Sequence, residues 1–137
     1  MTITQLYSTA EKSKICIDED LHISVPSMAC EIGDFRHIGL QRGLTESQKR
    51  ECMAHEIGHH KRGALYCIEA PIFTRAQCEQ KANNWAAHKL MPWRSLEKAV
   101  RLGYTEAWQL AEYFDVSEDF VRKAVEIYAQ EGKTIEL

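Results

Sequence analysis

The stretch His55-Glu56-Ile57-Gly58-His59 organises the rest of the chain. On an α-helix, residues four apart lie on one face with Cβ atoms about 6 Å apart, so two imidazoles at this spacing can converge on one metal ion. Glu56 follows the first histidine and can reach a water on that metal from the side. This H-E-x-x-H pattern is typical of a zinc site whose glutamate serves as a general base. The five residues therefore predict a metal centre, provided that they lie on a helix.

The residues before the motif indicate such a helix. Thr45-Glu46-Ser47-Gln48 has the capping-box pattern, a threonine N-cap with glutamine three residues later. The pattern predicts a helix that runs to about Lys61 or Arg62, with Gly63 as its stop. The two histidines then fall in its last turns, where the helical backbone holds their separation.

A second helix is predicted after a connection that contains Pro71. Thr74-Arg75-Ala76-Gln77 repeats the capping-box pattern, and the helix should end at Met91, before Pro92. Small and apolar residues recur along it at helical spacing and would let a neighbouring helix approach closely: Ala82, Ala86, Ala87 and Leu90.

Glu79 and Asn83 lie on or beside this stripe. A carboxylate on a buried face is costly unless something pairs with it, and a metal ion would do so. Because catalytic zinc commonly takes three protein ligands and keeps a fourth position for water, Glu79 is the best candidate to join His55 and His59. Asn83 is the candidate for orienting a ligand or contacting substrate. Glu79 could instead be a solvated carboxylate that the helix dipole stabilises, and the residues alone leave both interpretations open.

The remaining residues predict a small sheet before these helices and further helices after them. A helix is expected over 3–14, and short strands over 15–17, 22–25, 28–32 and 35–40 form a small antiparallel sheet packed on the motif helix. After Pro92, three helices are expected, capped by Ser95, Thr105 and Ser117. The predicted fold class is α+β and mostly helical, a single domain over 1–137 with a helical C-terminal subregion over 93–137.

Composition and charge limit the expected surroundings. The formal net charge of −3 gives no overall reason to expect a nucleic-acid partner. No apolar run approaches the length of a membrane span, and residues 1–6 lack the pattern of a secretory signal. The five cysteines form no C-x-x-C, and their odd number favours reduced thiols in a cytoplasm.

Four further residues are candidates for lesser roles. Cys52 lies three residues before the first motif histidine and could lie near the metal, although buried free cysteine is common. His60 lies about 100° round the helix from its neighbour, which indicates a surface or supporting position rather than a ligand. Tyr66 and His37 are the candidates for stabilising an oxyanion.

Taken with a later stretch, the motif resembles a known family, the ImmA/IrrE metallopeptidases. That family pairs an H-E-x-G-H helix with a later E-x-x-A-N-x-F-A-x-x-L-L-M-P helix. The second motif is matched here by Glu79-Gln80-Lys81-Ala82-Asn83-Asn84-Trp85-Ala86-Ala87-His88-Lys89-Leu90-Met91-Pro92. Trp85 replaces the usual Phe and Lys89 replaces the first Leu, and the resemblance is close over about residues 35–92.

The resemblance implies a zincin-like fold and a zinc metallo-endopeptidase. It implies Zn²⁺ as the cofactor, held by His55, His59 and Glu79, with Glu56 as the catalytic glutamate. It also implies a protein substrate, often a helix-turn-helix transcriptional repressor encoded on a phage or mobile element. No direct nucleic-acid partner and no membrane are expected.

Two other functions compete with this interpretation. Residues 108–114 and 118–128, separated by a break, look like the helix-turn-helix of a DNA-binding regulator. The second of these helices begins Glu118-Asp119, however, and carboxylates there would be repelled by phosphates. The chain could also be a non-catalytic metal-binding interaction module, although metal binding alone requires no acid at Glu56.

Overall fold

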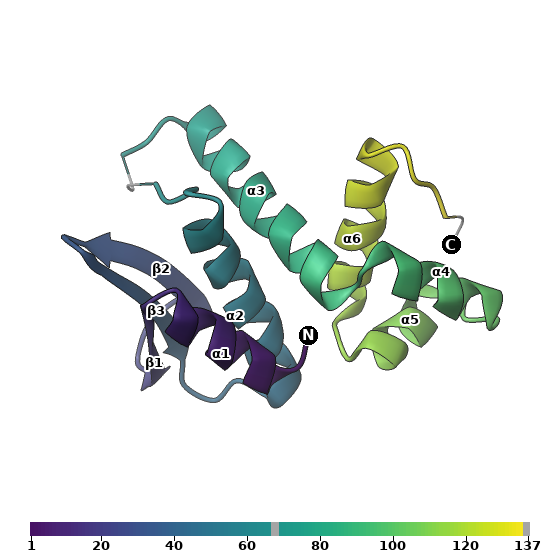
Figure 1. Ribbon diagram of the computed structural model, residues 1–137, viewed down its shortest axis with the longest axis horizontal. Helices are drawn as coiled ribbons and strands as arrows, with labels where there is room; N and C mark the ends of the chain where they lie inside the picture. The colour runs from purple at the N-terminus through teal and green to yellow at the C-terminus, as the bar shows by residue number, and fades with distance from the viewer. Residues whose placement is uncertain (67–68, 136–137) are drawn as a thin grey trace.

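The structure, a computed structural model, describes residues 1–66 and 69–135 (Figure 1). Within these residues the elements are α1 (Ile3–Lys12), β1 (Ile15–Leu21), β2 (Ser27–Ile32), β3 (Phe35–Gln41), α2 (Glu46–Lys61), α3 (Ile72–Leu90), α4 (Trp93–Arg101), α5 (Ala107–Phe114) and α6 (Glu118–Gln130). The prediction of a mostly helical α+β fold with a small sheet is confirmed.

The sheet has the strand order β1-β3-β2. β2 and β3 form an antiparallel hairpin, as predicted, but β1 pairs with β3 in parallel, so the prediction of a purely antiparallel sheet is wrong for this ladder. The reason is that β3 inserts between the two earlier strands, and residues 22–34 form the crossover that a parallel pair requires. The strand expected over 22–25 is absent from the sheet, because these residues connect β1 to β2 across the end of β3.

The motif helix lies between the sheet and α3 (Figure 1). One face of the sheet contributes Ile15, Ile38 and Leu40 to the core, and α2 contributes Met53, Ala54 and Ile57. At 25 cal/mol per Å² of apolar surface, each fully buried side chain of this size stabilises the fold by roughly 1.5–3 kcal/mol. With this face of α2 fixed on the sheet, the other face of the helix packs against α3.

Gly58 allows the two helices to approach closely. A Cβ atom at this position would lie 2.8 Å from the carbonyl oxygen of Ala82 and 3.1 Å from its Cα. No side chain fits in that space without moving the backbone of α3. The glycine of the motif therefore sets the distance between the helix that carries the two histidines and the helix that carries Glu79.

Proline, rather than serine or threonine, begins two of the later helices. α3 begins after Pro71, and α4 begins after Pro92. The predicted caps at Thr74 and Ser95 are therefore wrong, because the fixed φ of proline starts each helix earlier and places these residues in the first turn. The predicted caps at Thr45 and Ser117 are confirmed by hydrogen bonds to backbone N–H groups.

The cap of α5 is displaced by one residue from the prediction. α5 begins at Ala107 after Glu106, so Thr105 is not its cap. In the C-terminal part, α6 packs against α5 and α3, where the buried Tyr128 hydroxyl donates to the carbonyl of Met91 at 2.7 Å. Among the described residues, no helix is both long and apolar enough to cross a bilayer.

Candidate metal centre

Three ligand-type side chains from two helices converge beside the last turns of α2. Nε2 of His55 lies 2.8 Å from Oε2 of Glu79, and Nε2 of His59 lies 3.3 Å from Oε1. The two Nε2 atoms are 3.1 Å apart. The helical spacing of the histidines and the packing of α3 on α2 together produce this arrangement.

These separations fit a metal ion. Zinc binds imidazole nitrogen and carboxylate oxygen at about 2.0–2.2 Å, and two ligand atoms of a tetrahedral site are then about 3.3 Å apart. The three separations, 2.8, 3.1 and 3.3 Å, are equal to that value or somewhat shorter. The donor set, two imidazoles and one carboxylate, also leaves a fourth position open.

Hydrogen bonds on the far side of each ring set the orientation of both histidines. Nδ1 of His55 lies 2.8 Å from Oδ1 of Asn83, and Nδ1 of His59 lies 2.8 Å from the carbonyl oxygen of Ala64. Both partners are acceptors, so each Nδ1 carries its proton and donates it. In the neutral rings both Nε2 atoms then present lone pairs to the same point, which is the arrangement found around metal ions.

The ionisation of the cluster favours a positive charge at its centre. When the rings also carry a proton on Nε2, hydrogen bonds from His55 and His59 lower the pKa of the Glu79 carboxyl. Burial alone would lower the pKa of His59, but its bonds to Glu79 and Ala64 outweigh this effect and raise it overall. A carboxylate and two imidazoles held together in this way stabilise a cation, either a proton or a metal ion.

Glu56 is buried on the neighbouring face of α2, with 6% of its surface exposed. Burial raises the pKa of its carboxyl, although the two motif histidines oppose the shift. The hydroxyl of Ser27, at the start of β2, donates to Oε1 at 2.9 Å. Glu56 is thus a fixed carboxylate with more affinity for a proton than an exposed one.

A cleft of about 390 Å³ opens at this centre. Strand β2 and the segment before it form one wall, and the residues after α2 form another. Its lining comprises Val25, Ser27, Met28, Ala29, Glu56, His59, Leu65, Tyr66 and Glu79. The Tyr66 hydroxyl donates to Oε1 of Glu79 at 2.8 Å, so one of the two candidate oxyanion stabilisers does line the cleft.

Three other residues that the sequence marked as candidates lie outside the ligand group. His37 does not reach the cleft: it lies on β3, and its carbonyl accepts a hydrogen bond from Nε2 of His60. Of the two positions expected for His60, on the surface or in a supporting role, its burial excludes the first, and its hydrogen bond supports the sheet. Within the described residues, Cys52 does not join the ligand group and instead contacts Ser27.

Two contributors to the site were not predicted. Ser27 follows Pro26 at the start of a strand, and nothing local marks it as the partner of a glutamate 29 residues later. Nothing in the sequence predicts the contact of the Ala64 carbonyl with His59 either, because every residue carries a backbone carbonyl. The Gly63 stop, where φ is +58°, turns the chain so that this carbonyl faces His59.

Comparison with known proteins agrees with the two-helix centre. The curated proteins and the solved structures gave no significant match to this chain. The sequence profile of the peptidase M78 family, described as the IrrE N-terminal-like domain, matches residues 17–126 and so spans most of the sheet, both helices of the centre and most of α6. The chain belongs to this peptidase family, as its resemblance to the ImmA/IrrE metallopeptidases implied.

Proposed function

We propose that the protein is a zinc-dependent metallo-endopeptidase. In this proposal His55, His59 and Glu79 hold Zn²⁺, and Glu56 is the general base. The observation that carries it is the convergence of two Nε2 lone pairs and a carboxylate, with both Nδ1 protons directed away from the centre. An ordinary cluster of surface histidines has no need of this orientation.

Zinc suits the donor set of two nitrogens and one oxygen, and it performs hydrolysis without redox chemistry. When bound, the ion supplies Lewis-acid chemistry, which makes water a better nucleophile near neutral pH and polarises a peptide carbonyl. Asn83 and the Ala64 carbonyl keep the two rings in the orientation that presents Nε2. Removal of such an outer partner typically weakens metal affinity about 10- to 100-fold.

Glu56 has the properties of a general base. Its carboxylate borders the cleft, and burial raises its pKa, which brings its proton affinity closer to that needed for proton transfer near neutral pH. It accepts a proton from the attacking water and passes it to the leaving amine. The hydroxyl of Ser27 holds Oε1 throughout, so the other oxygen stays free for this exchange.

The substrate path runs along β2. This strand pairs with β3 on one side and is one of the two edge strands of the described sheet, and three of its residues line the cleft: Ser27, Met28 and Ala29. An extended peptide can add to such an edge through main-chain hydrogen bonds, which form with peptides of many different sequences. That mode would bring a peptide bond beside Glu56.

The substrate class extends the proposal further and depends on the family resemblance. A helix-turn-helix repressor of a phage or mobile element is the proposed substrate. The proposal also places the protein in the cytoplasm, where such a repressor acts. Sequence alone supports this part.

A Glu56→Gln variant tests the peptidase proposal. The amide introduced by this substitution keeps the size of the side chain and a partner for Ser27, but it cannot accept a proton. We expect unchanged zinc content and loss of cleavage of a co-expressed repressor, assayed by gel and mass spectrometry. Glu46→Gln, an exposed change on the same helix, is the matched control and should cleave normally.

Equal cleavage by the Glu56→Gln variant would show that the carboxylate is not the base. Inactivation of the repressor without cleavage, by both proteins alike, would favour the interaction module instead. Loss of zinc from the variant would mean that Glu56 belongs to the metal site rather than to proton transfer.

A further inference from the structure

The outer face of the sheet carries a second group of metal-ligand side chains. Cys16 and Asp18 lie two residues apart on β1, so their side chains point to the same face. His37 on β3 is the direct partner of Cys16 in the parallel ladder. The Sγ, carboxylate and imidazole atoms of the three residues lie within 4.8 Å of one another.

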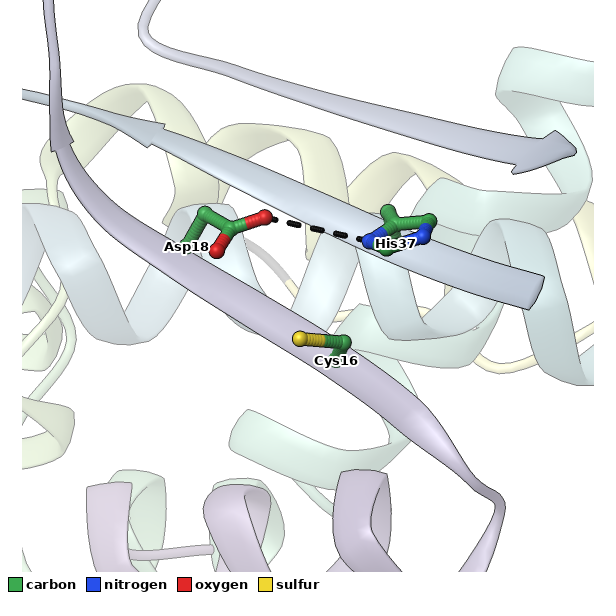
Figure 2. A group of neighbouring side chains, drawn as sticks. All are labelled: Cys16, Asp18 and His37. Atoms are coloured by element: carbon green, nitrogen blue, oxygen red, sulfur yellow. Dashed lines mark ion pairs between the residues drawn. The ribbon is translucent and has the colours of Figure 1, made fainter.

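This group is separate from the His55 centre. The buried Ile15 and Ile38 alternate with Cys16 and His37 along their strands and point into the core beneath α1 and α2. The three outer side chains therefore project from the opposite face. Figure 2 shows Asp18 and His37 directed toward each other, with Cys16 on the same strand as Asp18 and below His37 in this view.

An ion pair alone does not explain the arrangement. Nδ1 of His37 lies 3.8 Å from Oδ2 of Asp18, and the Asp18 side chain is 56% exposed. An exposed pair of this length contributes little to stability, and often nothing measurable. It also leaves unexplained why a thiol occupies the position opposite the histidine.

We propose that Cys16, Asp18 and His37 form a second metal site, which binds a borderline-soft divalent cation such as Zn²⁺. Thiolate, imidazole and carboxylate are each ligands of zinc, and small rotations of exposed side chains bring atoms 4.8 Å apart to the spacing of a tetrahedral site. A fourth position stays open to solvent or an external ligand.

The site would clip β1 to β3 where their pairing becomes irregular. The regular ladder ends at Asp18, and its register shifts between Asp18 and Leu21. A metal bound by residues of both strands would stabilise the folded chain, because the unfolded chain does not hold the three ligands together.

Cobalt titration of the full chain tests the site through a signal of its own. A thiolate ligand produces a sulfur-to-cobalt charge-transfer band, and the proposed ligands of the His55 centre include no sulfur. We expect the band in the wild type and in a His55→Ala variant. It should vanish in Cys16→Ser, and cobalt affinity should fall at this site by at least the roughly 10- to 100-fold that loss of an outer-shell partner costs.

Cys30 offers the matched control. It is the partner of His37 in the other ladder, yet it lies outside the group found among the described residues. Cys30→Ser should keep the band and the rise in melting temperature caused by Zn²⁺, whereas Cys16→Ser should lose the sulfur band and part of that rise. Loss of the band in Cys30→Ser but not in Cys16→Ser would overturn the assignment, as would a band that appears only at millimolar cobalt. Persistence of the band in His55→Ala keeps this result independent of the peptidase proposal.

Discussion

A single methyl group added at Gly58 tests the packing that brings the two metal-binding helices together. In an exposed helix, Gly→Ala stabilises the fold by about 1 kcal/mol, because alanine has the higher helix propensity. Here the added Cβ would lie 2.8 Å and 3.1 Å from backbone atoms of Ala82. Carbon atoms in good contact are about 3.5–4.0 Å apart, so α2 and α3 would have to separate.

The two effects oppose each other, and the clash should be larger. Overpacking of a close-packed interior costs about 1–3 kcal/mol. The nearest atoms belong to the backbone, which cannot rotate away, so the cost should lie in the upper part of that range. The net result for Gly58→Ala is a loss of about 1–2 kcal/mol in the free energy of unfolding, or roughly 3–6 °C in melting temperature.

Urea unfolding of the chelator-treated protein measures this loss without a contribution from bound metal. Gly58→Val provides a graded test, because a larger side chain should destabilise the fold further. Zinc affinity is the second measurement: separation of the helices withdraws Glu79 from the histidines, so affinity should fall in both variants. A Gly58→Ala protein as stable as the wild type, with unchanged zinc affinity, would refute the argument from close approach.

Three further predictions concern the supports of the centre and the core. Asn83→Ala should weaken zinc binding about 10- to 100-fold in a competition titration, because the His55 ring loses the acceptor of its Nδ1 proton. Asn84→Ala is the control: it removes an amide that bonds to Gln80 on the exposed side of α3, and it should leave zinc binding unchanged. Arg50 donates to three backbone carbonyls that join α1 and the α5–α6 turn to α2, so Arg50→Ala should lower the free energy of unfolding by roughly 2 kcal/mol, while the exposed Arg101→Ala should change it little. Burial raises the pKa of Tyr128 to about 12 from an ordinary value of 10.0, so the folded chain holds this proton more tightly than the unfolded chain. The resulting stabilisation of the fold is complete below pH 10 and disappears as the pH rises toward 12. It should amount to no more than about 3 kcal/mol. Alkaline unfolding followed by circular dichroism should be steeper for the wild type than for Tyr128→Phe, and identical slopes would contradict this linkage.

The C-terminal helices bear on the DNA-binding alternative. The N-terminus of α6, which would have to enter a DNA groove, is docked on α2: the backbone N–H and hydroxyl of Ser117 both donate to Glu51, at 3.2 Å and 2.9 Å. The side chain of Asp119, at the same end, is 96% exposed and would face phosphates. Both observations argue against DNA recognition by this helix and favour its role in packing on α3.

Local patterns in the sequence were sufficient for the elements whose start and spacing depend on neighbouring residues. The capping box at Thr45 and the four-residue spacing of the histidines both act within one helix, so the motif helix and its two convergent rings follow from local rules. The antiparallel hairpin of β2 and β3 also follows, since Gly33-Asp34 forms the turn between them. The predicted starts of α3 and α4 are too late, because a proline and a Ser or Thr cap both lie near each start and the helix begins after the proline.

Contacts between residues far apart in the chain were decided only by the tertiary structure. The parallel pairing of β1 with β3 depends on which strand enters the middle of the sheet, and the hydrophobic alternation of a strand is the same for either direction. The distance from Glu79 to the histidines depends on two helices meeting at a glycine. The local pattern around Glu79 left both a ligand and a solvated acid open, and the position of α3 brings its carboxylate to 2.8 Å from Nε2 of His55.

The sequence by itself thus determined the motif, its helix and the family to which the chain belongs. The tertiary structure decided which partners surround these residues: Ser27 on Glu56, the Ala64 carbonyl on His59, and Cys16 opposite His37 on the outer face. The physical reason is the separation along the chain between the residues that interact. Caps and helical spacing act over a few residues, whereas the orientation of a ligand ring or the grouping of a second set of ligands depends on packing and strand register across the whole chain.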